Sequence, residues 1–131
     1  MTWLAPNDNG SVITSYRILI VQQDGAFSED TLNCDGSDSG TLAALQCTIP
    51  LLDLQTYPYS LQLGDSIFAK VSATNLYGES AFSESGNGAT IVLVPSAPVN
   101  LANNLAVTTK SVIGITWKNG ASTGGSPLID Y

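Results

Sequence analysis

Short stretches in which apolar and polar residues alternate dominate the chain, and they predict β-strands. The clearest alternation runs over 66–73, where every second residue is apolar. The set expected to point inward is Ile67, Ala69, Val71 and Ala73, and the set expected to point outward is Phe68, Lys70 and Ser72. Gly and Pro interrupt most windows longer than about 12 residues, which leaves little room for long helices. The pattern therefore predicts an all-β protein.

Four further stretches have the composition of strands, and they are 15–21, 45–49, 90–94 and 111–117. Both faces of 15–21 are rich in apolar residues, so we expect this strand to be covered on both sides. In 111–117 the residues Ile113, Ile115 and Trp117 share one face. Short strands separated by clusters of turn residues favour an antiparallel β-sandwich.

The start of the chain recurs near its end. Trp3, Gly10, Ser11, Ile13 and Tyr16 correspond to Trp117, Gly125, Ser126, Leu128 and Tyr131. The tryptophans are 114 positions apart and the tyrosines 115, a spacing that suits one sandwich domain. The chain therefore has the pattern of slightly more than one unit of a tandem array, with chance similarity of short turn motifs as the alternative.

Several of these residues resemble the fibronectin type III family. In that family the second strand ends in a tryptophan, which a Pro/Gly-rich loop and a tyrosine follow, as do Trp3, the loop 6–11 and Tyr16 here. The segment 67–78 is similar to the sixth-strand signature of the family, and Pro95 and Pro98 resemble its interdomain prolines. More particularly, the stretch between Cys34 and Asp65 resembles the long repeat arrays of large protist surface proteins. The resemblance implies an antiparallel, immunoglobulin-like fibronectin type III β-sandwich.

The resemblance also implies that the chain is out of register with the domain boundary. Residues 1–95 would form a sandwich that lacks its first strand (A) and most of its second (B). Residues 96–131 would supply strands A and B and the start of C in the register of a following unit. The linker 95–98 reaches at most about 14 Å, which is shorter than the sandwich. We therefore expect 96–131 to complete a neighbouring copy or to begin the next covalent repeat; a chain cut away from a domain boundary is the alternative.

Two sets of contact residues follow from this arrangement. The donated strands would make contact through Val99, Leu101, Ile113, Ile115 and Trp117. The accepting core would be lined by Ile18, Ile20, Ile67 and Val71. Strand addition across a head-to-tail contact generates an open filament rather than a closed dimer. The expected partners are therefore copies of the chain itself.

The charge of the chain excludes several classes of partner and chemistry. Only 4 of the 131 residues are Lys or Arg, and the net charge is −7, which suits neither nucleic acids nor an anionic membrane. There is no histidine, so Ser–His and Cys–His nucleophile pairs and histidine metal sites are absent. No apolar run reaches the roughly 18 residues of a membrane span, and the first residues lack the regions of a signal peptide. We therefore expect no enzyme, no cofactor and no membrane insertion in this segment.

Cys34 and Cys47 predict a structural disulfide, because an even cysteine count in an acidic, Ser/Thr/Gly-rich chain suits an oxidising compartment. Two reduced, half-buried thiols in an intracellular domain are the alternative. The acidic stretch 28–38 has oxygen ligands for calcium but matches no EF-hand spacing, so a solvated turn-rich loop is favoured and no metal is expected. Asn9 begins an Asn-Gly-Ser sequon, and it is either a glycan site or a plain turn.

Together these features predict a non-enzymatic, extracellular or cell-surface structural repeat that builds a fibre or coat. The alternative is an adhesion or receptor ectodomain module that binds a protein or a carbohydrate. In that case Phe68 and the segment 57–59 are candidate contact aromatics, although 57–59 could equally be a packed loop. A third class is an accessory domain of a secreted polysaccharide-degrading enzyme. Both tryptophans are expected to be core residues rather than sugar platforms.

Overall fold

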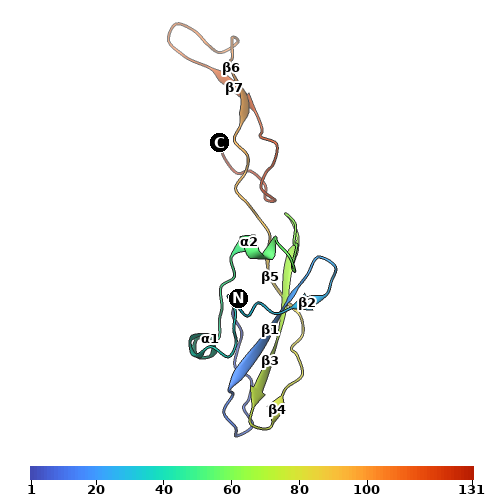
Figure 1. The fold of residues 1–131 in the computed structure, drawn as a ribbon. Coiled ribbons are helices and arrows are strands. Elements are labelled where there is room, and N and C mark those ends of the chain that lie inside the picture. Colours follow the sequence, from blue (N-terminus) through green and yellow to red (C-terminus); the bar gives the residue numbers. More distant parts are fainter. The chain divides into compact units, whose positions relative to one another are not determined.

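The computed structural model describes residues 1–131 and divides them into two compact units, Met1–Ile91 (unit 1) and Val92–Tyr131 (unit 2) (Figure 1). Unit 1 contains β1 (Ser15–Val21), β2 (Phe27–Ser28), α1 (Ser39–Ala44), α2 (Leu51–Leu54), β3 (Ser66–Asn75), β4 (Gly78–Glu79) and β5 (Gly86–Thr90). Unit 2 contains β6 (Val99–Asn103) and β7 (Ile115–Lys118). Strands make up 28% of the residues and helices 8%, and every strand pair is antiparallel, in agreement with the expected all-β class.

The sheet of unit 1 is built around β1 and β3. These two strands pair from Ser15 opposite Thr74 to Ile20 opposite Ala69. On the other side of β1 lies β2, and β4 and β5 pair with β3. The predicted strands 15–21 and 66–73 are both confirmed, and β3 continues to Asn75.

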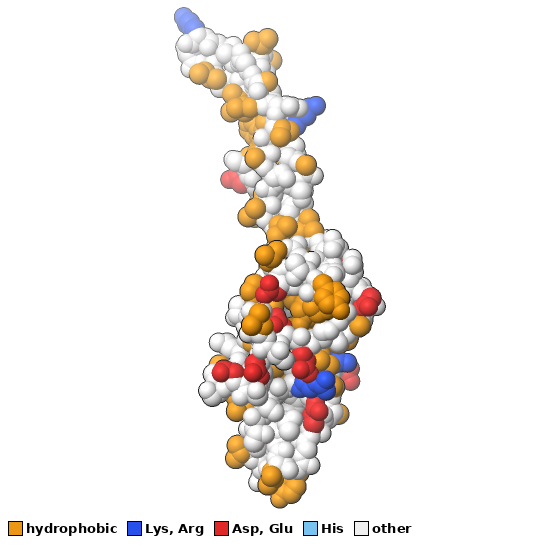
Figure 2. All heavy atoms as spheres, in the orientation of Figure 1, with side chains coloured by type: hydrophobic (Ala, Val, Ile, Leu, Met, Phe, Trp, Pro, Cys, Tyr) orange, Lys and Arg blue, Asp and Glu red, His pale blue; other side chains and the backbone are white.

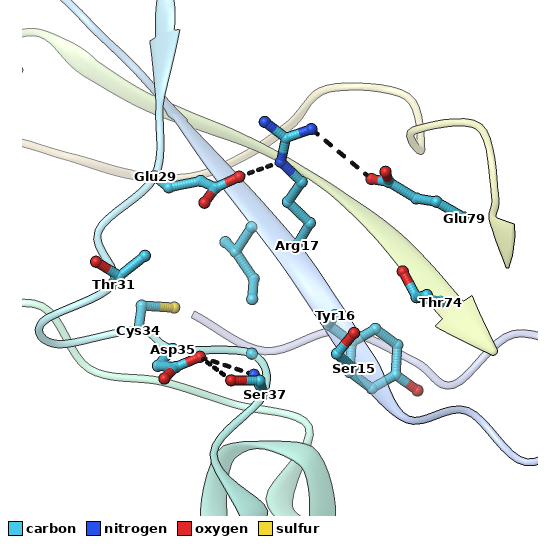
Figure 3. Close-up of a pocket in the computed structure, with 12 residues that line it drawn as sticks. Ser15, Tyr16, Arg17, Glu29, Thr31, Cys34, Asp35, Ser37, Thr74 and Glu79 are labelled. Atoms are coloured by element: carbon cyan, nitrogen blue, oxygen red, sulfur yellow. Dashed lines mark hydrogen bonds and ion pairs between the residues drawn. The ribbon is translucent and has the colours of Figure 1, made fainter. Parts of the chain in front are cut away.

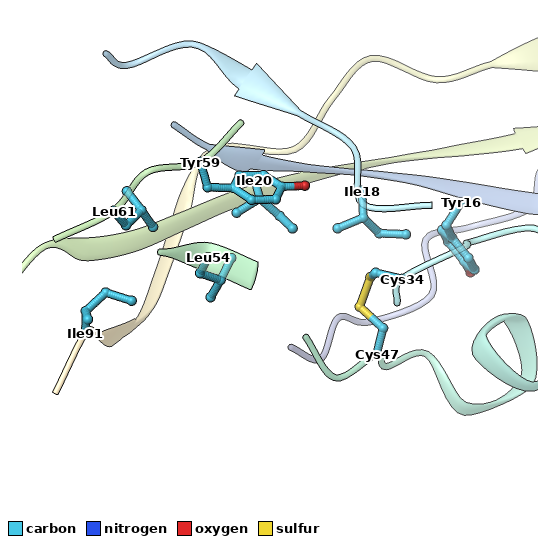
Figure 4. Packing of buried hydrophobic residues seen from close by; sticks show 9 residues of the cluster. All are labelled: Tyr16, Ile18, Ile20, Cys34, Cys47, Leu54, Tyr59, Leu61 and Ile91. Carbon is cyan, nitrogen blue, oxygen red and sulfur yellow. A yellow bond between two sulfur atoms is a disulfide. The ribbon is translucent and has the colours of Figure 1, made fainter. Parts of the chain in front are cut away.

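One face of this sheet carries the core of unit 1 (Figure 4). The buried hydrophobic residues are Tyr16, Ile18, Ile20, Cys34, Cys47, Leu54, Tyr59, Leu61 and Ile91. Tyr16 and Ile18 lie beside the two cysteines, whereas Ile20 lies nearer Tyr59, Leu61 and Leu54. The alternation of β1 thus places every second side chain against segments that arrive from residues 34–61 and from residue 91.

The opposite face is covered less completely than the sequence predicted. Arg17 is exposed there, while Leu19 and Val21 are half-buried. Lys70 Nζ lies 4.3 Å from the centre of the Phe27 ring and 5.2 Å from that of Phe82. The guanidinium of Arg17 lies 5.8 Å from the same Phe82 ring. Cation–π contacts and aliphatic stems, rather than a second sheet, therefore cover this face.

Ser72 lies on the outward face of β3, opposite Arg17, as the alternation predicts, but it is buried there. The sequence predicted an exposed side chain, but Ser72 is only 2% exposed. Its hydroxyl donates a 2.5 Å hydrogen bond to the Glu79 carboxylate. The partner carboxylate satisfies the hydroxyl, which allows a polar side chain to be buried. The predicted exposure of Ser72 is therefore wrong, because the carboxylate that accepts its hydrogen bond comes from β4.

The predicted strand 45–49 is wrong. Asp38 caps the helix α1, because its carboxylate accepts hydrogen bonds from the amides of Gly40 and Thr41. The helix then ends at Leu45, which has a left-handed conformation with a φ of 53°. Only an isolated bridge between Thr2 and Gln46 remains in this region. A local cap therefore prevails over the short apolar run.

The predicted strand 90–94 is also wrong, because the strand lies earlier in the chain. β5 covers the Gly-rich segment Gly86–Thr90, all of whose residues are exposed. Ile91 is fully buried, its amide donates to the Asp65 carbonyl, and its carbonyl accepts from Gly64. Pairing with β3 needs only backbone groups, so an exposed strand with no apolar alternation gives no sequence signal.

Unit 2 is a two-stranded ribbon with a loop on each side. β6 and β7 pair through Val99 opposite Lys118, Ala102 opposite Thr116 and Asn103 opposite Ile115, with a register shift between Val99 and Ala102. Only 115–117 of the predicted strand 111–117 is a strand, and β6 lies within the segment 96–131 from which two strands were expected. Gly114 precedes β7 at a point where a Cβ would lie 2.7 Å from Val107 Cβ.

Candidate functional site

The Trp/Tyr repeat in the sequence is also a repeat of local structure. The rings of Trp3 and Tyr16 have centres 5.4 Å apart and an interplanar angle of 63°. The rings of Trp117 and Tyr131 have centres 5.6 Å apart and an angle of 60°. Two segments far apart in the chain thus bring the same pair of aromatic rings together in nearly the same geometry.

The turn between each tryptophan and tyrosine is repeated as well. Asn9 and Gly10 have φ values of 52° and 83°, and Gly124 and Gly125 have φ values of 76° and 85°. Two successive positive φ values are typical of a type I′ turn, which favours Asn-Gly and Gly-Gly. The turn forms in different surroundings: Asn75 Nδ2 donates to the Asp8 carbonyl in unit 1, whereas the Leu93 amide donates to the Gly124 carbonyl in unit 2.

The backbone before Trp3 is seated on the segment that follows α1. The Trp3 amide donates to the Leu45 carbonyl over 3.1 Å, and the Cys47 amide donates to the Met1 carbonyl over 3.0 Å. Thr2 therefore lies opposite Gln46 in an isolated antiparallel bridge. The backbone of Leu45–Cys47 thus pairs with an extended segment outside the main sheet of unit 1. We call these three residues the 45–47 edge.

The expected donor residues gather on unit 2 and are all exposed. Their exposed fractions are 48% for Val99, 71% for Leu101, 83% for Ile113, 52% for Ile115 and 40% for Trp117. Val99 and Leu101 lie on β6, Ile115 and Trp117 on β7, and Ile113 in the loop before it. Some apolar side chains of unit 2 are visible as orange patches in Figure 2. The ribbon therefore presents its hydrophobic side chains without burying them.

The expected acceptor residues lie together in unit 1. Ile18 and Ile20 are buried on β1, at 3% and 0% exposure. Ile67 and Val71 are partly buried on β3 and pack against the same core, and Val71 is paired with Ile18. The four residues thus belong to one hydrophobic cluster, which the neighbouring segments 34–61 already cover in part.

A disulfide joins Cys34 and Cys47, and both residues are buried in the core. The loop between them lies against β1, where the Tyr16 amide donates to the Gly36 carbonyl over 2.9 Å. A Cβ at Gly36 would lie only 2.0 Å from the Tyr16 carbonyl oxygen, so no side chain fits there. The disulfide and Gly36 therefore hold the loop and the 45–47 edge against the sheet.

The acidic residues of this loop are engaged in local hydrogen bonds. Asp35 accepts from the hydroxyl and the amide of Ser37, and these bonds lower the pKa of its carboxyl group. Asp30 accepts from the amides of Leu32 and Asn33. The structure contains no group of three or more His, Cys, Asp or Glu residues that could hold a metal ion. Asp30, Asp35 and Asp38 thus serve as turn and cap residues.

A polar hollow of about 410 Å³ lies beside the start of β1 (Figure 3). Arg17 stands between Glu29, to which its Nε donates, and Glu79, whose carboxylate lies 4.0 Å from the guanidinium. The hydrogen bond to Glu29 is the main cause that raises the pKa of Arg17. Both carboxylates are already paired with the one arginine, and red acidic side chains are scattered over the face drawn in Figure 2. The hollow holds no unpaired group in the arrangement of an acid–base site.

The other candidate residues fall into two classes. Asn9 is exposed in its turn and so is accessible to glycosylation. Phe68 is 37% exposed and Tyr57 is 91% exposed, whereas Tyr59 is buried with its hydroxyl unpartnered. The segment 57–59 is thus divided between the surface and the core. The sequence predicted a full strand over 45–49, of which only the bridge at Gln46 forms, and it gave no sign that Met1–Trp3 pairs there.

Comparison with known proteins gives no family for the chain: no protein-family model, curated protein or solved structure matches it. None of the helices has the length and apolar character needed to cross a membrane.

Proposed function

We propose that the chain is a fibronectin type III-like structural repeat of an extracellular fibre or surface coat, with no catalytic role. Units would join head to tail, either by donating the β6–β7 ribbon to a separate copy or by tandem repetition within a longer chain. In both routes 96–131 provides the first two strands of the next unit. The Cys34–Cys47 disulfide supports an oxidising location.

The repeated Trp–Tyr pair is the observation that carries the proposal. Unit 2 reproduces the ring geometry and the turn with which unit 1 begins, and its Tyr131 is the counterpart of Tyr16, with which the β1 core begins. Unit 2 therefore has the features of the start of a second unit without the sheet on which that start is packed. Its exposed Ile115 and Trp117 are the side chains that such a sheet would cover.

The energetic argument points in the same direction. Burying an apolar side chain contributes about 1.5–3 kcal/mol, and the five donor residues are each at least 40% exposed. A strand edge and an apolar face on one ribbon also favour addition to another sheet. Joining units would remove both exposed features at once.

Sedimentation velocity over a range of protein concentrations tests the donation route. We expect the chain to form concentration-dependent head-to-tail oligomers, and Trp117→Asp to reduce association at least tenfold, because it places a charge in the buried contact. Ile129→Asp is the matched control, since Ile129 is fully exposed in the same unit and outside the ribbon. Chains that remain monomeric at every concentration would rule out donation between separate copies.

A further inference from the structure

We propose that β7 of one copy binds the 45–47 edge of another copy in a fixed register, with Thr116 opposite Gln46, and takes the place of Met1–Trp3 there. This inference rests on the proposed head-to-tail function and specifies its contact. The occupant is a second copy of this chain, and the bound segment is Ile115–Trp117.

The register follows from a segment that is already seated on this edge. Met1, Thr2 and Trp3 correspond to Ile115, Thr116 and Trp117, because the tryptophans are 114 positions apart and a threonine precedes each of them. Thr2 lies opposite Gln46. By equivalence, Thr116 of an added strand lies opposite Gln46, and its tryptophan takes the position of Trp3.

The backbone of β7 has the free edge that this contact needs. In an antiparallel strand, successive residues direct their N–H and C=O groups to opposite edges. The Gly114 carbonyl accepts from Asn104, on the β6 side, so Ile115 and Trp117 direct their backbone groups to the other edge. The two-stranded sheet has no third strand there, and no hydrogen bond outside the ribbon involves either residue.

The 45–47 edge forms its hydrogen bonds with the same alternate residues. Met1 and Trp3, the counterparts of Ile115 and Trp117, are the residues that exchange backbone hydrogen bonds with Leu45 and Cys47. Ile115 and Trp117 of β7 have free backbone N–H and C=O groups. These residues correspond to Met1 and Trp3, whose backbone groups are hydrogen-bonded to the 45–47 edge in unit 1. A strand shifted by one residue would direct the wrong groups, and the wrong side chains, to this edge.

The added strand also offers more than the segment it replaces. Met1–Trp3 is held by an isolated bridge and is followed by Leu4, which is 91% exposed. β7 arrives already paired with β6 and brings Ile115 in the position of Met1. A ribbon that is ordered before binding loses less conformational entropy than a single free strand.

Disulfide trapping between variants that each carry one added cysteine tests the register. Thr2 and Gln46 are a non-hydrogen-bonded antiparallel pair, whose Cα atoms lie about 4.5 Å apart, within reach of a disulfide. We mix chains that carry Thr116→Cys with chains that carry Gln46→Cys, oxidise them mildly and identify the joined peptides by mass spectrometry. The matched control replaces Gln46→Cys with Thr48→Cys, since Thr48 is also exposed and lies two residues further along. A third chain with Thr2→Cys and Gln46→Cys shows that this position forms a disulfide within the chain.

We expect the Thr116–Gln46 disulfide between copies to form at least tenfold more than the Thr116–Thr48 disulfide. Equal trapping at both positions, or preference for Thr48, in chains that associate would overturn the register and leave the proposed function in place. Chains that neither associate in sedimentation nor form either disulfide would overturn the register and donation together. Both variants keep the native cysteines, and circular dichroism of each confirms that unit 1 is folded.

Discussion

The two units share one motif, which opens unit 1 and closes unit 2, but they differ in what covers it. In unit 1, Trp3 and Tyr16 are packed on a core of buried residues that extends to Ile91. In unit 2, Trp117 and Tyr131 form the same pair, yet no hydrophobic side chain of the unit is buried, and its buried residues are Gly114 and Gly124. The motif therefore forms from local contacts, while its burial depends on a sheet that follows it in sequence.

This difference distinguishes what forms the motif, which is local sequence, from what stabilises it, which is tertiary packing. Positive φ values at Asn-Gly and Gly-Gly produce the same turn with different hydrogen-bond partners. Gly124 lies so near the Leu93 carbonyl oxygen that a Cβ would be 2.0 Å away, whereas its counterpart Asn9 carries an exposed side chain. Most of the stability of a small β unit comes from apolar burial, so we expect unit 1 to unfold cooperatively and unit 2 to gain stability only when units join.

The largest difference should appear between isoleucine substitutions in the two units. Ile20 is fully buried and Ile129 is fully exposed. We expect Ile20→Ala to lower the free energy of unfolding of unit 1 by about 2–5 kcal/mol through the cavity it leaves. Ile129→Ala should change it by less than about 0.5 kcal/mol. Urea unfolding, followed by Trp3 fluorescence in a Trp117→Phe background, measures both values; a similar effect of the two substitutions would contradict the assigned core.

A glycine pair tests the contact between the disulfide loop and β1. We expect Gly36→Ala to lower the free energy of unfolding by about 1–3 kcal/mol or more, because the added Cβ would overlap the Tyr16 backbone. Gly88 lies in an exposed strand and a Cβ added there would meet no atom within 4 Å, so Gly88→Ala is the control. The same urea experiment compares them, and a stable Gly36→Ala variant would show that the loop does not lie against β1.

A tyrosine pair tests the smallest effect, which depends on pH. Burial, and to a lesser degree the carboxylates of Asp30 and Glu29, raise the pKa of Tyr59 to about 12. Because the folded state holds this proton more tightly than the unfolded state, the stabilisation is complete below about pH 10 and is lost as the pH rises toward 12. Stability falls rather than rises with pH because burial favours the neutral phenol over the charged phenolate.

Tyr59→Phe should remove this loss above about pH 10 and raise stability by about 1 kcal/mol at neutral pH, since the Tyr59 hydroxyl is buried without a partner. Tyr57→Phe is the matched control, because Tyr57 is 91% exposed. Unfolding free energies measured between about pH 8 and pH 12 distinguish the two variants. An alkaline loss that persists unchanged in Tyr59→Phe would assign it to another group.

The sequence predicts best those elements whose signal is carried by their own side chains. The range of β3 follows closely from its clear alternation, and the range of β1 follows from an apolar run bounded by turn residues. Ile18 and Ile20, which the resemblance placed in the core, are buried. β5 is Gly-rich and exposed, and only its backbone pairing with β3 defines it. The burial of Ser72 requires Glu79, which reaches it from another strand.

The candidate contact surfaces show the same division. The donor residues can be chosen from the repeat, because Trp117 and Ile115 match positions near the start of the chain. The 45–47 edge cannot, because the sequence favours a full strand there, whereas the Asp38 cap and the left-handed Leu45 leave a single bridge. Such an edge depends on where a helix ends, and helix ends are set by caps rather than by apolar periodicity.

Hydrogen exchange in a lengthened chain tests the central claim most directly. Residues 17–91 are fused after Tyr131, so that unit 2 continues as unit 1 does after Tyr16, and a fusion of the same residues after Pro127 is the out-of-register control. We expect the amides of Ile115 and Trp117 to exchange at least a hundredfold more slowly in the fusion after Tyr131 than in the 131-residue chain, at any protein concentration, and no such protection in the control. Equal exchange rates in all three chains would contradict the claim that 96–131 begins a second unit.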